Sequence, residues 1–163
     1  PVAQMRSMLK VAEDMGAEID VSREGLSIIA DENRRAIPYL KTEVYPGFPT
    51  DMQSLLMAAL TTAAGVSVIE ETIFENRFRI VDQLKKMGAC IELQGNRQAV
   101  IVGVDGLLGC EVDAEELRGG AALVIAGCMA LGETVVNNRH FIERGYEDIC
   151  RDYQNLGANV YIG

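Results

Sequence analysis

The chain has 163 residues, of which 48% are hydrophobic and 24% charged, and its formal net charge is −9. This length suits one domain, or two very small ones, with a proper hydrophobic core. The acidic balance argues against binding nucleic acid or an anionic membrane through bulk charge, although a few well-placed arginines would still make a locally positive pocket for an anionic small substrate.

The first recognisable segment, residues 12–30, predicts the end of a helix, a Met-Gly-Ala stop and two short strands around a polar turn. The same pattern recurs at residues 84–103 and begins a third time at residues 153–163, at intervals of about 70 residues, which indicates an internal repeat. Gly16, Gly88 and Gly157 stand where the C-terminus of a helix favours positive φ.

A second repeated segment lies between the copies of the first, and its two copies, residues 50–78 and residues 117–145, align without gaps. The matched pairs are Gly65 with Gly132, Phe74 with Phe141, and Arg77 with Arg144. Each block predicts a helix, a glycine stop, a β-branched strand and a second helix. The first helix is apolar on nearly all sides and should be buried, whereas the second, 75–88 or 142–157, is amphipathic and should lie outside.

One unit is therefore a buried helix, a strand, an outer helix and two strands. The sequence holds one complete unit and parts of two others, which predicts an α/β fold with the repeat helices at the centre and the sheets outside. The first part begins inside an outer helix at Pro1 and lacks its buried helix and first strand. Because a packed repeat seldom starts in mid-unit, we expect the native chain to extend upstream.

The stretch "YPGFPTDMQ", residues 45–53, places two prolines and a glycine just before the first apolar helix. Thr50 and Gln53 have the spacing of a capping box, which leaves Asp51 as the first helical residue, where the helix dipole favours its charge by about 0.3–1 kcal/mol. A carboxylate held at a rigid helix start could serve as a general base. The competing interpretation is an ordinary first-turn acid that complements the dipole.

The repeat departs from itself at Asp51, because Arg118 occupies the matching position in the second block. If both helices begin at the same end of the domain, these two side chains face that end, with Arg77 and Arg144 nearby. An acid among arginines at helix starts predicts a site for a phosphate or carboxylate group. The alternative for each arginine is a surface ion pair with an acid such as Glu115, Glu116 or Glu143.

The four cysteines are dispersed at positions 90, 110, 128 and 150, with no C-x-x-C pair and one histidine in the chain. This gives no zinc signature, and it suits a reducing compartment in which cysteines act as small buried apolar residues. The longest weakly polar run, 119–132, is shorter than the roughly 20 residues that cross a bilayer. We expect a cytoplasmic protein that uses no metal and no cofactor.

Five segments, "YPGFPTDMQ", "ETIFENRF", "KKMGA", "LRGGAALVIAG" and "RGYE", together resemble the UDP-N-acetylglucosamine enolpyruvyl transferase (1-carboxyvinyltransferase) family. The resemblance runs in order from Leu40 to Gly163 and is weaker over residues 1–39. It implies an inside-out α/β barrel of the enolpyruvyl transferase type, built from repeated βαβαββ units around central helices. Residues 1–163 would then be most of the second domain of a two-domain enzyme, with the first unit incomplete and the other domain absent.

The resemblance also implies a reaction, in which the enolpyruvyl group of phosphoenolpyruvate moves to the 3-hydroxyl of UDP-N-acetylglucosamine and phosphate is released. This is the first committed step of peptidoglycan synthesis. Asp51 matches the family's proposed base. The residues that match substrate contacts are Ile73 and Phe74 for the nucleotide-sugar, Arg118 and Arg144 for phosphoenolpyruvate, and Arg77 in the same motif.

Some features of the family are altered or missing in this chain. Glu116 stands where the family usually has aspartate, and the family's catalytic cysteine and lysine-asparagine pair belong to the other domain, so Cys90, Cys110, Cys128 and Cys150 are interpreted as structural. The chain alone should be inactive, and its partners should be the two small-molecule substrates and the missing N-terminal domain in cis. Two alternatives stay open: a shikimate-phosphate enolpyruvyl transferase, and a non-catalytic nucleotide-sugar-binding paralogue.

Overall fold

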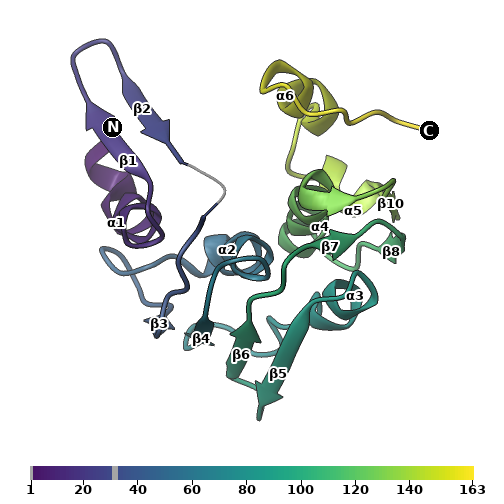
Figure 1. Ribbon diagram of the computed structural model, residues 1–163. Coiled ribbons are helices and arrows are strands. Elements are labelled where there is room, and N and C mark those ends of the chain that lie inside the picture. The colour runs from purple at the N-terminus through teal and green to yellow at the C-terminus, as the bar shows by residue number, and fades with distance from the viewer. Residues whose placement is uncertain (1, 31–32) are drawn as a thin grey trace.

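The computed structural model of the chain describes residues 2–30 and 33–163 (Figure 1). Pro1, where the repeat predicts the interior of a helix, lies outside the described residues. The first partial unit opens with the 3₁₀ turn η1 (Val2–Met5) and helix α1 (Arg6–Asp14). Strands β1 (Glu18–Val21) and β2 (Leu26–Ile29) then pair antiparallel, as the sequence predicts.

The complete unit occupies the middle of the chain. Its elements are the 3₁₀ turn η2 (Thr50–Met52), α2 (Gln53–Leu60), β4 (Val66–Glu70), α3 (Val81–Lys86), β5 (Cys90–Gln94) and β6 (Gln98–Val102). Together with β3 (Leu40–Lys41), its strands form a sheet of order β3-β4-β6-β5, in which only β3 and β4 run parallel. The predicted order of buried helix, strand, outer helix and two strands is confirmed.

The last part of the chain starts a second unit. Its elements are β7 (Leu107–Leu108), β8 (Glu111–Asp113), α4 (Leu117–Met129), β9 (Ala130–Leu131), β10 (Val135–Asn137), α5 (His140–Glu143) and α6 (Ile149–Asn155). Its strands form two short parallel pairs, β8 with β10 and β7 with β9. The described sheets do not close into a barrel, but the α/β fold with helices at its centre is the predicted one.

Helices α2 and α4 pack against one another at the centre of the molecule, above the four-stranded sheet in Figure 1. Seven of the residues of α4, from Gly119 to Val124 and Ala126, are buried, and Met57 and Leu60 of α2 have 0% and 1% of their surface exposed. Burial of each such large side chain contributes about 1.5–3 kcal/mol. The prediction that the first helix of each block is buried is therefore confirmed.

The glycine stops also behave as predicted, because Gly16, Gly88 and Gly157 have φ of 112°, 93° and 92°. The outer helices are shorter than predicted. Only Val81–Lys86 of residues 75–88 is helical, since Asn76 has a φ of 56°, which no α-helix accommodates.

The expected helix over residues 142–157 is two helices with a break at Gly145. A Cβ at Gly145 would lie 2.6 Å from Cδ2 of Leu117, so the chain passes too close to the start of α4 for any larger residue. The Asp148 side chain then accepts a hydrogen bond from the Arg151 N–H and begins α6 as a separate helix.

All four cysteines are free thiols, but the expectation that they are buried is wrong for two of them. Cys90 and Cys128 are exposed, and Cys110 and Cys150 are half-buried. Within the described ranges, no helix combines the length and apolarity needed to cross a membrane.

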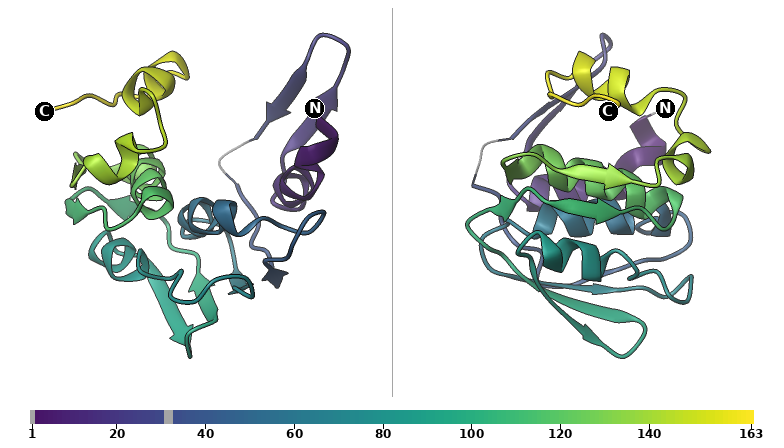
Figure 2. Two further views of the ribbon diagram at one scale, coloured as in Figure 1. Left: turned by 180° about the vertical axis from the view of Figure 1, so that it is seen from behind. Right: turned by 90° about the vertical axis from the view of Figure 1, so that its right-hand side faces the viewer.

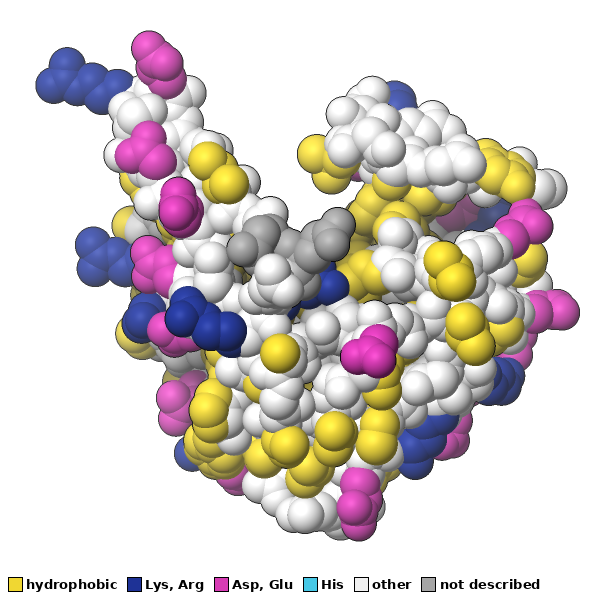
Figure 3. All heavy atoms as spheres, in the orientation of Figure 1, with side chains coloured by type: hydrophobic (Ala, Val, Ile, Leu, Met, Phe, Trp, Pro, Cys, Tyr) yellow, Lys and Arg dark blue, Asp and Glu magenta, His cyan; other side chains and the backbone are white. Residues whose placement is uncertain are grey.

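Two arms rise from this body on opposite sides of a notch (Figures 2 and 3). One arm is the β1–β2 hairpin with α1, and the other carries α6 and the C-terminus. The space-filling view shows yellow apolar side chains along the α6 side of the notch.

Candidate functional site

The start of α2 is built differently from the capping box that the sequence predicts. Pro49 is the N-cap residue of η2, and among the described residues no side chain caps η2 or α2. The hydroxyl of Thr50 instead donates to Oε2 of Glu71 at 2.9 Å and accepts from Nε of Arg77 at 3.2 Å. Gln53 is fully buried, and its Oε1 accepts a hydrogen bond from the Ser54 hydroxyl. The local motif is therefore overridden by tertiary contacts.

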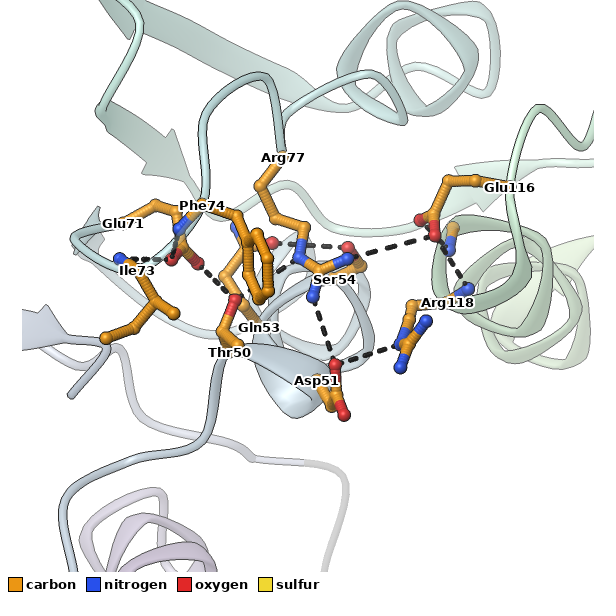
Figure 4. A network of polar contacts seen from close by, with 11 residues as sticks. Thr50, Asp51, Gln53, Ser54, Glu71, Ile73, Phe74, Arg77, Glu116 and Arg118 are labelled. Atoms are coloured by element: carbon orange, nitrogen blue, oxygen red, sulfur yellow. Dashed lines mark hydrogen bonds and ion pairs between the residues drawn. The ribbon is translucent and has the colours of Figure 1, made fainter. Parts of the chain in front are cut away.

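Asp51 projects from η2 toward two guanidinium groups (Figure 4). Its Oδ1 lies 3.0 Å from Nη2 of Arg77 and 2.9 Å from Nε of Arg118. The Asp51 side chain is 57% exposed, so solvent screens most of the Coulombic gain. These contacts therefore act mainly by fixing the position of the carboxylate.

Arg77 is the most buried member of this group, with 13% of its side chain exposed. Its guanidinium carbon lies 5.0 Å from the ring centroid of Phe74, a cation–π contact, and its Nη1 lies 4.0 Å from Oε2 of Glu116. With Thr50 and Asp51 also bound, the guanidinium is held from several directions.

Glu116 is the N-cap residue of α4. Its Oε2 accepts a hydrogen bond from the Arg118 N–H at 3.1 Å, and its Oε1 accepts one from the Gly119 N–H. The longer side chain thus satisfies two free N–H groups at the helix start, next to the arginine that contacts Asp51.

The structure does not bring all the predicted site residues into contact. Arg144 is exposed at the C-terminal end of α5 and has no ion-pair partner among the described residues. Its neighbour Gly145 packs on Leu117, so Arg144 lies near the start of α4 without touching Asp51.

Ile73 and Phe74 lie in the loop that follows β4 and are held by a residue that the sequence analysis missed. Glu71 has 0% of its surface exposed, and its Oε1 accepts hydrogen bonds from the N–H of Ile73 at 2.8 Å and of Phe74 at 3.0 Å. The alternation in β4 carries the missed signal, because Ser67, Ile69 and Glu71 all face inward.

The two loop residues present apolar side chains to solvent, with 38% of Ile73 and 53% of Phe74 exposed. Their N–H groups are already engaged by Glu71, which leaves the carbonyl oxygens and the side chains for a ligand. Beside them lies a hollow of about 190 Å³. It is lined by Phe74, Glu75, Asn76, Arg77, Arg79 and Glu116.

This hollow is smaller than the roughly 300–1,000 Å³ of a typical ligand pocket. A larger hollow, of about 320 Å³, lies between the start of α1 and Tyr45–Pro46, and Arg6 is the charged residue in its lining. The residues that the structure describes contain no group of three or more His, Cys, Asp or Glu side chains placed to hold a metal ion. The chemistry available is a carboxylate that can accept a proton and guanidinium groups that can bind an anion.

The fold and this site define a class of protein. Residues 2–152 match the family model described as EPSP synthase (3-phosphoshikimate 1-carboxyvinyltransferase), so the chain belongs to this family of carboxyvinyl, or enolpyruvyl, transferases. Within the family, the chain is similar to UDP-N-acetylglucosamine 1-carboxyvinyltransferases. It is 46% identical over 160 residues to enzyme 1 of Caldanaerobacter subterraneus subsp. tengcongensis, covering 98% of this chain and 38% of that protein.

A second relative, UDP-N-acetylglucosamine 1-carboxyvinyltransferase 1 of Clostridium perfringens, is 46% identical over 156 residues, which cover 94% of this chain and 37% of that protein. Among solved structures, the enolpyruvyl transferase NikO from Streptomyces tendae superposes with a TM-score of 0.84 at 24% identity, over 95% of this chain and 36% of that one. This structural likeness establishes the fold. The chain spans less than two fifths of the length of the two curated relatives named here.

Proposed function

We propose that this chain is part of an enolpyruvyl transferase that moves the enolpyruvyl group of phosphoenolpyruvate to the 3-hydroxyl of UDP-N-acetylglucosamine, releasing phosphate, for peptidoglycan synthesis. The names of the similar proteins support the substrates. The observation that carries the proposal is the Asp51 carboxylate, held by Arg77 and Arg118 at a helix start.

The contacts of Asp51 support the proposed role of general base. Both guanidinium groups contact its Oδ1, and its Oδ2 has no partner among the described residues. In the proposed reaction Oδ2 takes the proton of the sugar 3-hydroxyl as that oxygen bonds to C2 of phosphoenolpyruvate. A general acid of the other domain adds a proton to C3, and phosphate then leaves C2 as a base takes one proton from C3 and the double bond re-forms.

The remaining predicted residues would bind substrates. Arg118 and Arg144 supply positive charge near the start of α4 for the anionic groups of phosphoenolpyruvate. Ile73 and Phe74 would offer their exposed side chains and backbone carbonyls to the nucleotide-sugar, and Arg77 holds Asp51 in place.

We further propose that residues 1–163 form most of the second domain of a two-domain cytoplasmic enzyme. The share of each relative that the chain covers supports this assignment, as does a hollow smaller than a typical ligand pocket. The substrates and the other domain would be its partners, with no nucleic acid, membrane or cofactor, and the isolated chain should not catalyse the transfer.

The test is phosphate release by the whole natural protein, given phosphoenolpyruvate with either UDP-N-acetylglucosamine or shikimate 3-phosphate. We expect release with the nucleotide-sugar alone. The shikimate acceptor is the second candidate, because the matching family model carries its name. Binding of the nucleotide-sugar by calorimetry without phosphate release would instead identify a non-catalytic paralogue.

A further inference from the structure

Glu71 is a fully buried carboxylate that has no ion-pair partner in the described part of the chain. Burying a carboxylate is costly unless hydrogen bonds replace the lost water. Glu71 accepts three such bonds, from the N–H of Ile73, the N–H of Phe74 and the hydroxyl of Thr50, at 2.8, 3.0 and 2.9 Å. All three partners donate, which suits a group that only accepts.

These bonds connect the two halves of the candidate site (Figure 4). Oε1 of Glu71 fixes the Ile73–Phe74 loop, whereas Oε2 orients the Thr50 hydroxyl. Thr50 in turn accepts from Nε of Arg77, and Arg77 donates to Asp51. A single buried side chain thus sets the loop and, through two more residues, the carboxylate.

The internal repeat shows that the fold does not demand this arrangement. In the second block, Asn138 occupies the position of Glu71 and Leu117 that of Thr50. Asn138 has a φ of 59°, and Leu117 packs on Gly145. The same unit therefore folds without the carboxylate and the hydroxyl. Their presence in the first block thus indicates a role in the candidate site, since folding does not need them.

We propose that Glu71 is a positioning residue that sets, at the same time, the loop that contacts the acceptor and the Thr50–Arg77–Asp51 chain. This inference rests on the proposed function. Glu71 then has two separable effects. Its hydrogen bonds to the Ile73–Phe74 loop (the loop branch) govern the KM for the nucleotide-sugar, and its hydrogen bond to Thr50 (the Thr50 branch) governs kcat.

The experiment compares Glu71→Gln, Thr50→Val and the control Glu70→Gln in the whole natural protein. The isosteric amide of Glu71→Gln weakens both branches, and we expect the KM for the nucleotide-sugar to rise and kcat to fall, each about tenfold, as for loss of a hydrogen bond to a charged group. Thr50→Val leaves the loop bonds intact, so kcat should fall with little change in that KM. Glu70 bonds to Tyr39 on the exposed surface, and Glu70→Gln should match the unaltered protein.

Hydrogen exchange of the peptide that contains residues 72–78, followed by mass spectrometry, is the second readout. Exchange should be faster in Glu71→Gln than in Glu70→Gln, because the Ile73 and Phe74 N–H groups lose their charged acceptor. Equal exchange in these two variants would overturn the proposal. So would a Thr50→Val variant that raises the KM as much as Glu71→Gln, because the two branches would not be separable.

If the unaltered protein transfers no enolpyruvyl group to either acceptor, the proposed function fails. The KM and kcat of the variants then have no value for comparison. The exchange comparison still decides whether Glu71 holds the loop. The two failures are therefore distinguishable.

Discussion

Nε of Arg118 lies 2.9 Å from Oδ1 of Asp51, although the two residues occupy matching positions in different copies of the repeat. Each stands at the start of a central helix, α2 or α4, and these helices pack against one another. The pairing shows that both helices begin at the same end of the molecule. A carboxylate and a guanidinium group at equivalent positions of the repeat are thus in contact in one site.

Replacing Asp51 by asparagine should abolish most turnover of the whole protein. The amide oxygen can still accept from Arg77 and Arg118, but the side chain no longer takes a proton, so we expect kcat to fall about 100-fold or more. The KM for both substrates should change little. Steady-state phosphate release measures both, with Asp105→Asn in an exposed turn as the control. Near-normal turnover would remove Asp51 from the role of base.

Replacing Arg118 by lysine tests its fork-shaped donor group. Lysine keeps the charge but loses the Nε–H that contacts Asp51, and it cannot bind a carboxylate or phosphate through two parallel bonds. We expect the KM for phosphoenolpyruvate to rise about tenfold. Arg151→Lys, on exposed α6, is the matched control, and equal kinetics of the two variants would contradict the assignment.

The Glu116→Asp variant tests whether the N-cap of α4 needs the longer glutamate side chain. Aspartate is a preferred N-cap, so the free energy of unfolding should change by less than about 0.5 kcal/mol, whereas Glu116→Ala should lower it by about 1 kcal/mol. Urea unfolding measures both values. An equal loss in the two variants would show that capping of α4 depends on the longer side chain.

Gly103 allows a test of close packing in the fold. A Cβ at this position would lie 1.7 Å from the carbonyl oxygen of Ala63, so Gly103→Ala must displace backbone. We expect it to lower the free energy of unfolding by about 1–3 kcal/mol. Gly106→Ala, with nothing within 4 Å of the added carbon, should be close to neutral in the same thermal or urea titration. Similar values for both would refute the packing described here.

The Cys128 thiol offers a pH-dependent measurement. Although Cys128 lies at the surface, partial burial of its thiol raises its pKa, which keeps the thiol protonated, and therefore less reactive, to higher pH than an unhindered cysteine. Alkylation by iodoacetamide, located by mass spectrometry, should increase at Cys128 only at more alkaline pH than for N-acetylcysteine. Coincident pH profiles would contradict the effect of burial.

The repeat could be predicted from the sequence because its signals are local. Glycine stops such as Gly88 require positive φ, and the buried helices are apolar on nearly every side, so neither depends on distant partners. The encounter of Asp51 with Arg118 also followed, because aligning the two blocks placed both residues at helix starts.

What the sequence missed depends on contacts between distant segments. Thr50 has the spacing of a capping residue, but Glu71, 21 positions away, takes its hydroxyl. The amphipathic pattern around Arg144 predicted one helix, but the contact of Gly145 with Leu117 divides it. Both outcomes are set by tertiary packing, which local patterns do not encode.

The separation of Asp51 from Arg118 depends on how closely α2 and α4 pack, and both helices contribute buried alanines to the core. A bulkier residue placed midway along this helix pair would separate the two helix starts and leave every polar group of the candidate site chemically intact. Loss of turnover would then arise about one to two helical turns away from the reacting groups. A survey of variants confined to the candidate site would overlook it.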